Sequence, residues 1–200
     1  MRVSREQAAE NRQRIVETAS RMFREHGFDG VGVDAIMNGA GLTHGGFYGH
    51  FRSKDDLAAE AMTRALERSV EKQRRYTKLD DLVSDYLSGQ HCANRARGCA
   101  LAALAADIAR EGEGVRGALT TYVRGQLDRF TCLLRNGAAA SRRRRAITTL
   151  AGMVGALTLA RAVDDPALSE EILTAAREAF GGTRRAADST NGGTQLGDRH

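Results

Sequence analysis

The chain of 200 residues has no tryptophan, a single proline at position 166 and few aromatic side chains of any kind. It also lacks alternating runs of β-branched residues bounded by turn signals, and this absence argues against a β-sheet. What remains is long stretches of alanine, leucine and arginine in which apolar residues recur at helical spacing. We therefore predict an all-α fold of one or two domains.

Cysteine is scarce, and no long hydrophobic run is free of polar residues. The three cysteines are an odd number, and the first 14 residues contain no apolar segment typical of a signal peptide. We therefore expect free thiols and a cytoplasmic protein. The most apolar window, residues 146–163, contains three threonines and Arg161, so we interpret it as a buried helix and not as a membrane span.

The charge balance is modestly basic, with a net charge of +5. Such a balance permits a phosphate-rich partner but does not prove one. The first 54 residues hold eight basic and six acidic side chains, so the basic excess is not concentrated near the N-terminus. The local placement of particular residues must therefore carry any argument for DNA binding.

The N-terminal quarter of the chain predicts a small helical domain over residues 1–52. Residues 1–9 predict a flexible polar arm, and a first helix over 10–26 would end at Gly27. Two short helices over 33–39 and 43–50, separated by a glycine-containing turn, complete the pattern of a helix-turn-helix.

The remainder predicts a larger helical domain over residues 53–180. Ser53 is a good N-cap for a helix reaching to about residue 75, which would connect the two domains. Five further helices are expected over 79–88, 98–110, 115–135, 142–163 and 166–180. The polar residues 181–200 predict a disordered tail.

The short helix predicted over 43–50 carries side chains that suit a DNA groove better than a protein core. The Thr43 hydroxyl is expected to cap it, and Phe47 and Phe51 could anchor it on the preceding helices. Its polar groups and N-terminal N–H groups could bind phosphates. The expected DNA-binding residues are Thr43, His44, Gly45, Gly46, Phe47, Tyr48, His50 and Lys54.

Three glycines, at positions 45, 46 and 49, fall within this short helix. Each glycine inside a helix costs about 0.5–1 kcal/mol relative to alanine, so their presence needs a reason. One interpretation is close approach of the backbone to DNA. The alternative is that the segment is a turn and not a helix.

Residues 15–57 resemble the N-terminal domain of the TetR family of transcriptional regulators. The resemblance covers about a quarter of the chain, and the spacing of its residues is specific. The matching residues are Ile15, Ala19, Phe23, Gly27, Phe28, Val33, Ile36, Ala40, Gly41, Leu42, Thr43, Gly45, Phe47, Tyr48, His50, Phe51, Ser53, Lys54 and Leu57. It implies that residues 43–50 form the recognition helix and that Tyr48, His50 and Lys54 grip phosphates.

Two departures and one weaker match qualify this resemblance. Gly32 and Gly46 stand where the family often has threonine or serine, so two hydroxyl contacts are missing. The sequences RGCALAAL, from Arg97, and ALTLARAV, ending at Val163, are similar to one branch of the family. This second match implies a ligand-sensing domain whose last two long helices pair with those of a second subunit.

Small residues in the helix over 142–163 also predict dimerisation, because they let another helix approach closely. The alternative is an ordinary intramolecular core. The expected dimer residues are Leu150, Val154, Leu157, Leu168 and Ile172.

The middle helices supply the candidate contacts for a small ligand, which is expected to be apolar or aromatic. These residues are Met62, Tyr86, Leu104, Tyr122 and Phe130.

The sequence therefore predicts a homodimeric, ligand-responsive transcriptional regulator, most simply a repressor, that binds a palindromic operator in double-stranded DNA. An alternative is a thiol-based sensor of oxidants or electrophiles that uses Cys99, with Cys92 or Cys132 as a second thiol. A small enzyme using Cys99 and His91 has no oxyanion-hole or phosphate-loop motif to support it. Because the cysteine spacing fits no common zinc pattern, we expect no metal, and we expect no cofactor or membrane partner.

Overall fold

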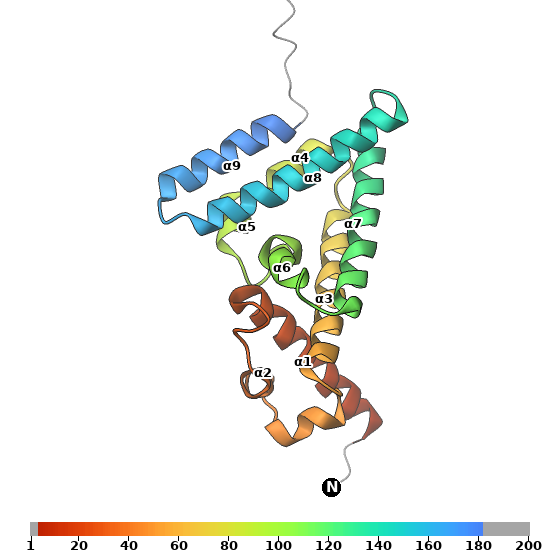
Figure 1. The fold of residues 1–200 in the computed structure, drawn as a ribbon, viewed down its shortest axis with the longest axis vertical. Coiled ribbons are helices and arrows are strands. Elements are labelled where there is room, and N and C mark those ends of the chain that lie inside the picture. Colours follow the sequence, from red (N-terminus) through yellow and green to blue (C-terminus); the bar gives the residue numbers. More distant parts are fainter. Residues whose placement is uncertain (1–3, 182–200) are drawn as a thin grey trace, which may run out of the picture.

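The computed structural model describes residues 4–181, and every regular element in this part of the chain is a helix (Figure 1). The predicted all-α fold is confirmed. Residues 1–3 and 182–200, and with them most of the predicted tail, lie outside the described residues. The helices are α1 (Arg5–His26), α2 (Val33–Gly39), the 3-10 helix η1 (His44–Gly49), α3 (Lys54–Gln73), α4 (Leu79–Tyr86), α5 (Gly89–Ala93), α6 (Ala100–Ile108), α7 (Glu113–Leu133), α8 (Ala139–Ala162) and α9 (Pro166–Phe180).

The first helix begins five residues earlier than predicted, so the expected arm over residues 1–9 is wrong from Arg5 onward. The cause is Ser4, whose Oγ accepts a hydrogen bond of 3.1 Å from the Gln7 N–H and caps the helix. The other end was predicted correctly. Gly27 adopts a φ of 77°, and its N–H donates to the Phe23 carbonyl at 2.8 Å.

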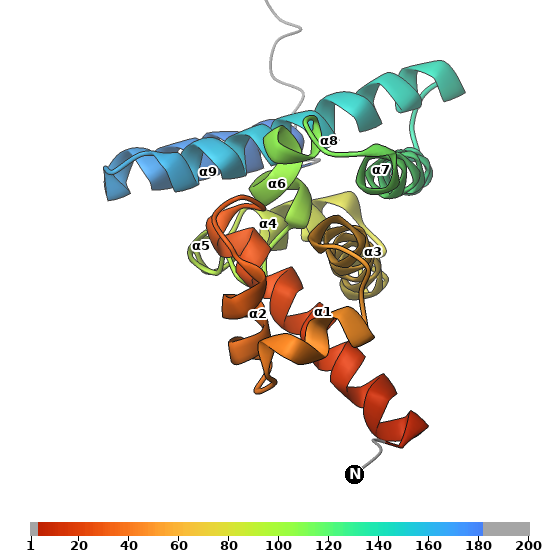
Figure 2. The ribbon, with the colours of Figure 1, turned by 60° about the horizontal axis from the view of Figure 1, so that its bottom comes forward.

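Helices α1, α2 and η1 gather at one end of the molecule, together with the start of α3 (Figure 2). Their shared core contains the fully buried side chains of Ile15, Phe23 and Ile36. Gly41 makes the turn between α2 and η1 with a φ of 68°, a conformation that a side chain would strain. This turn sets the direction of η1 relative to α2.

Helix α3 connects this end of the molecule to the rest of the fold. Its predicted cap is confirmed, because Ser53 Oγ accepts a hydrogen bond of 3.1 Å from the Asp56 N–H. One face of α3 buries Leu57, Ala61 and Leu66, and the helix packs against both α1 and α7. A shift of α3 would therefore change the packing against both α1 and α7.

Helices α8 and α9 pack side by side and cover the other end (Figure 1). Helix α8 begins at Ala139, so the four arginines at 142–145 lie beyond its first turn, where they oppose the helix dipole less. Arg143 also forms an ion pair with Asp128 of α7 at 2.6 Å. Within residues 4–181, no helix combines the length and the hydropathy that a membrane crossing requires.

Candidate nucleic-acid interface and ligand cavity

The short helix η1 has 3-10 geometry, with i to i+3 hydrogen bonds such as that from the Gly46 N–H to the Thr43 carbonyl at 3.0 Å. A helix over this segment was predicted, and the alternative of a plain turn is excluded. The predicted Thr43 cap is wrong, because its side chain makes no capping hydrogen bond. The Thr43 hydroxyl is instead exposed at the N-terminus of η1 and free to meet another molecule.

The outer face of η1 is exposed, and its inner face is anchored in the core. Thr43, His44 and Tyr48 are exposed, and 72% of the Tyr48 surface is accessible. Phe47 is buried and stacks on Phe51, with 5.8 Å between the ring centroids. The prediction that Phe47 contacts DNA is therefore wrong, because its ring fixes η1 from the protein side.

The packing of the protein does not require the three glycines of η1. A Cβ atom at Gly45 or Gly49 would meet no atom within 4 Å, and one at Gly46 would make an ordinary contact with Met37 at 3.6 Å. None of the three adopts a positive φ. The absence of side chains leaves the outer backbone of η1 open to a close partner.

A neighbouring helix holds one polar side chain of η1. His44 Nδ1 contacts the Asp34 carboxylate of α2, which is an ion pair when the imidazole is protonated, and His50 and Lys54 are half-buried. Asp34 was not among the predicted site residues, because the sequence gives no sign that α2 would bring it against η1. Its carboxylate can orient the His44 ring, while its charge opposes a phosphate at the same point.

Two arginines of α1 contact the segments on either side of η1. The Arg12 guanidinium lies over the Phe51 ring, 4.5 Å from its centroid, and forms an ion pair with Glu60. Arg14 donates a hydrogen bond to the Ala40 carbonyl at the turn before η1. The two arginines therefore tie α1 to both ends of the η1 segment.

The predicted dimer residues are divided between surface and core. Leu168 is exposed, and Leu150, Val154 and Ile172 are half-buried. Leu157 is fully buried within the protomer, so its assignment to an interface is wrong. The large apolar side chains that α8 exposes are Ile147 and Leu159, which were not among the predicted dimer residues.

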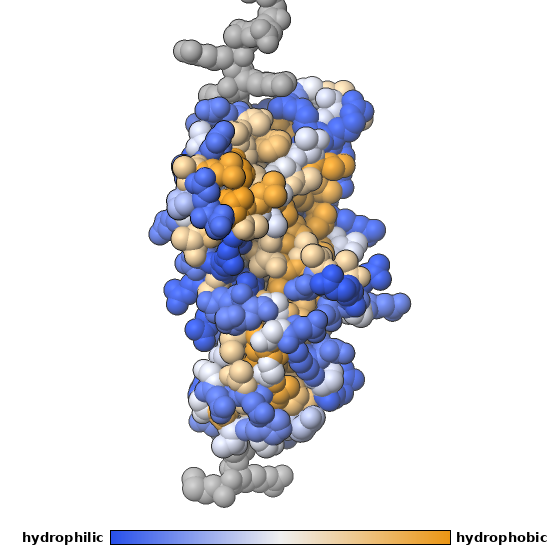
Figure 3. All heavy atoms as spheres, turned by 60° about the vertical axis from the view of Figure 1, so that its left-hand side comes forward, coloured by the Kyte–Doolittle hydropathy of each residue, from blue (hydrophilic) through white to orange (hydrophobic). Residues whose placement is uncertain are grey.

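These two exposed residues are part of a spaced row along α8. Ile147, Ala151, Gly155 and Leu159 follow each other at intervals of four, and the Gly155 position has open space beyond its backbone. Apolar surface gathers in the half of the molecule that contains α8 and α9 (Figure 3). This face can accept another helix at short range.

A cavity of about 750 Å³ lies among α3, α4, α5 and the 94–99 segment. Of the predicted ligand contacts, Tyr86 lines it, whereas Met62, Leu104 and Phe130 are packed in the core. Tyr122 lies behind the wall, and its hydroxyl is 3.1 Å from Ser69 Oγ. The lining is also more charged than predicted, because basic side chains of α1 and α3 reach it.

The cavity wall includes His91, which lies on a short helix where only a loop was predicted. Ser88 caps α5 by accepting a hydrogen bond from the His91 N–H at 3.2 Å. Burial lowers the pKa of His91, so the ring is neutral near pH 7. Its Nδ1 donates to the Tyr86 carbonyl at 2.6 Å, and its Nε2 accepts from the Cys99 N–H at 3.0 Å.

This geometry argues against a nucleophilic pair of Cys99 and His91. Both ring nitrogens are engaged with backbone groups, so neither is available to take the thiol proton. Cys99 is buried and lines the cavity, Cys92 is half-buried, and Cys132 is exposed; all three are free thiols. Within the part of the chain that the structure describes, no three His, Cys, Asp or Glu side chains are grouped to hold a metal.

The N-terminal part of the chain is similar to known transcriptional regulators. The family model described as bacterial regulatory proteins, tetR family, matches residues 15–61, which run from α1 into α3. A curated relative, the HTH-type transcriptional regulator SAB2452 of Staphylococcus aureus, is 35% identical over 82 residues. The match covers 41% of this chain and 43% of that protein, so the chain spans less than half of the length of this relative.

Solved structures resemble the fold over most of its length. The reduced form of NemR from E. coli has a TM-score of 0.69 at 21% identity, covering 86% of this chain and 95% of that one. A TetR-family regulator from Agrobacterium tumefaciens has a TM-score of 0.70 at 20% identity, covering 87% and 99%. At these identities, the likeness extends to the fold alone.

Proposed function

We propose that the chain is a TetR-family transcriptional regulator with a helix-turn-helix, and that it acts as a homodimeric repressor released from its operator by a small molecule. Residues 1–52 would form the DNA-binding unit, and residues 53–180 the unit for sensing and dimerisation. The observation that carries this proposal is η1, whose exposed outer face is held rigidly over the buried Phe47. We place the protein in the cytoplasm, where its DNA would be.

The chemistry of η1 supports insertion into the major groove. Thr43 and Tyr48 offer hydroxyl groups at its two ends, and Lys54 follows in the first turn of α3. Such groups bind phosphates and fix the register of a helix in the groove. His44 would read base edges, since it lies at the N-terminal end of η1. Gly45 and Gly49 would let the backbone approach the duplex.

The exposed face of α8 and α9 supports dimerisation. Ile147, Leu159 and Leu168 would leave water on pairing with a second copy, which gives a four-helix contact across a two-fold axis. Two-fold symmetry places two copies of η1 on one side of the dimer. A palindromic operator with half-sites about one helical turn apart, or a multiple of it, would match them.

Helix α3 would transmit the ligand signal. It begins next to η1, and its C-terminal half lines the cavity through Ser69, Lys72 and Gln73. A ligand that binds one arrangement of α3 more tightly than another shifts the spacing of the two recognition helices. Helix α3 alone can therefore couple the cavity to η1.

The experiment is a salt titration of DNA binding with Lys54→Ala. An operator is first selected from random duplexes, and affinity is then measured by fluorescence anisotropy over a range of salt concentrations. Loss of one phosphate contact should weaken binding to all sequences alike and reduce the salt slope by about one. Lys78→Ala, which removes the exposed lysine directly before α4, is the matched control and should leave the slope unchanged.

His44→Ala separates reading of the sequence from binding of the backbone. Its expected effect is a changed preference among operators at nearly constant salt slope. If Lys54→Ala and Lys78→Ala have equal slopes, the proposed docking is wrong. A footprint spread over all sequences would instead indicate a non-specific DNA-coating protein.

A thiol sensor that uses Cys99 is the second candidate function. It is favoured by the position of Cys99 in the cavity wall, at the N-terminus of α6, and the structurally similar NemR was solved in a form described as reduced. Operator release by an oxidant or electrophile should then be abolished in Cys99→Ser and retained in Cys132→Ser. Unchanged release in Cys99→Ser removes this candidate.

A further inference from the structure

The cavity among α3, α4 and α5 carries an excess of positive charge. Its lining contains five basic side chains, at positions 24, 68, 72, 75 and 97, and one carboxylate, Asp85. Glu17 of α1 lies outside the lining and forms an ion pair with Arg68, while Asp85 pairs with Arg75 at 3.3 Å. Two of the five cations are thus compensated by neighbouring carboxylates.

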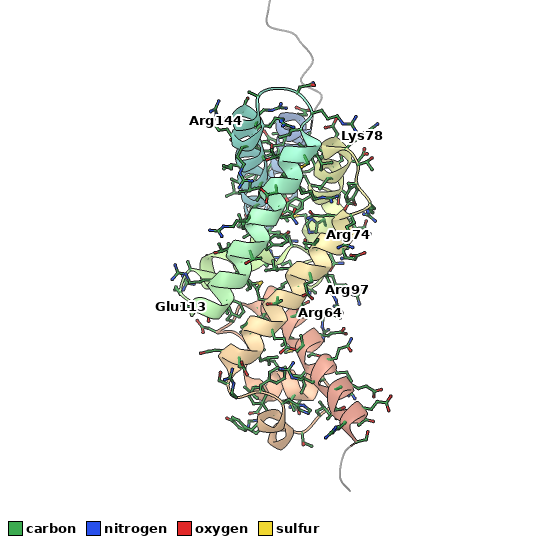
Figure 4. The ribbon with its side chains drawn as sticks, turned by 90° about the vertical axis from the view of Figure 1, so that its right-hand side faces the viewer. Arg64, Arg74, Lys78, Arg97, Glu113 and Arg144 are labelled. Atoms are coloured by element: carbon green, nitrogen blue, oxygen red, sulfur yellow. The ribbon has the colours of Figure 1, made fainter. Side chains whose placement is uncertain are left out.

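The other three cations have no carboxylate partner among residues 4–181. The buried Arg24 donates from Nε to the Ala96 carbonyl at 2.8 Å, and its two terminal nitrogens have no acceptor in the described part of the chain. Lys72 donates to the Arg97 carbonyl at 3.4 Å. The Arg97 side chain lies beside α3 (Figure 4). These cations come from α1, α3 and the 94–99 segment, and they converge on one cavity.

The grouping of cations around the cavity disfavours the charged form of Arg24. Burial, and after it the charge of Arg68, lowers the pKa of Arg24 to about 10. The nearby charge of Glu25 acts in the opposite direction but forms no ion pair with Arg24, so an anion beside the guanidinium would offset the remaining cost of burying it. The position of Arg24 near the end of α1 also ties the cavity to the helix that supports η1.

Two buried polar atoms in the same lining lack partners. Tyr86 Oη and Gln73 Oε1 are inaccessible to solvent and have no hydrogen bond of normal geometry in the described residues, although the Cys99 and Tyr122 side chains lie near them. Burial raises the pKa of Tyr86 well above its usual value, so its hydroxyl keeps its proton and remains a donor. Both atoms therefore belong to the wall behind the cavity surface, and the excess of cations at that surface indicates the class of ligand.

We propose that this cavity binds an organic carboxylate, with the anionic group facing Arg24, Lys72 and Arg97. The apolar body of the ligand would pack against Ala65, Leu82 and the Cys99 side chain, which complete the lining. The inference rests on the proposed function, because it assigns a ligand class to the regulator's sensing cavity. It adds an anionic group to the apolar or aromatic ligand predicted from the sequence.

The test compares two probes of the same shape, naphthoate and its neutral amide naphthamide. Binding to the full chain is measured by calorimetry in the absence of DNA. Naphthoate should bind once per subunit and at least about tenfold more tightly than naphthamide, as expected for a charge-assisted contact.

Variants of the exposed cations make the result specific to this cavity. Lys72→Gln and Arg97→Gln should each weaken naphthoate about threefold to tenfold, less than a buried contact because solvent screens them. Arg74→Gln and Arg64→Gln remove cations of the same region that do not line the cavity, and they should have no effect (Figure 4). Naphthamide affinity should be the same in all four variants.

Three outcomes would overturn the inference: no binding of either probe, equal affinity for the two probes, or equal losses in Arg97→Gln and Arg74→Gln. Operator binding without ligand is measured on the same preparations. A protein that binds its operator but not naphthoate disproves the ligand class alone. A protein that binds naphthoate but shows no preference for any DNA sequence disproves the proposed function alone.

Discussion

Replacement of Gly45 by alanine is expected to raise the stability of the free protein and to lower its affinity for DNA. The new methyl group would meet no atom within 4 Å, and the position has no positive φ. Alanine loses less conformational entropy on folding than glycine, so the free energy of unfolding should rise by about 0.4–1 kcal/mol.

The same methyl group would lie on the outer face of η1, where the duplex is expected to approach. Crowding of a close contact by one methyl group typically costs about 1–3 kcal/mol, which corresponds to a loss of about fivefold to 150-fold in affinity. Urea unfolding measures the first effect and fluorescence anisotropy with the selected operator measures the second.

Gly117→Ala is the matched control for this prediction. Gly117 is exposed on α7, and a Cβ atom there would also meet nothing within 4 Å. It should be stabilising by about 0.5–1 kcal/mol and leave DNA binding unchanged. If Gly45→Ala is equally stabilising and equally without effect on DNA affinity, the backbone of η1 does not approach DNA closely.

Three further predictions concern the support of η1, the dimer face and the cavity wall. Phe47→Ala should lower the free energy of unfolding by about 3–5 kcal/mol in urea titrations, and unchanged stability would contradict its role as the anchor of η1. Leu159→Glu should yield monomers in analytical ultracentrifugation, whereas a persistent dimer would place the interface elsewhere. Because burial lowers the pKa of His91, the unfolded chain binds its proton first, and stability should fall as the pH drops below about 6.5. Urea titrations should show a smaller loss in His91→Gln, and an equal loss would exclude His91 as its source.

Elements with local signals were predictable from the sequence. Ser53 and Gly27 mark a helix start and a helix end by hydrogen bonds to residues three or four positions away, and both boundaries were predicted correctly. Ser4 carries the same kind of signal, but the polar residues around it favoured a flexible arm. The candidate DNA-binding segment could be selected from the sequence because its polar and glycine residues are contiguous.

Features that depend on packing between distant segments were not predictable. Helix α8 carries small residues on all sides, so its sequence does not reveal that Leu157 faces the core and Leu159 faces solvent. The cavity combines Arg24 with Arg97, which are far apart in the chain, and its charge emerges only when α1, α3 and the 94–99 segment come together. The pairing of His44 with Asp34 depends in the same way on the turn at Gly41.

The central claim is that the outer face of η1 contacts the DNA. Its most direct test is a photocrosslink from a benzoylphenylalanine placed at Tyr48, the exposed aromatic residue of η1. On irradiation with the selected operator, this variant should crosslink to DNA, whereas the same group at Leu159 should crosslink one subunit to the other. A position-48 variant that binds the operator with normal affinity but crosslinks only to protein would contradict the account.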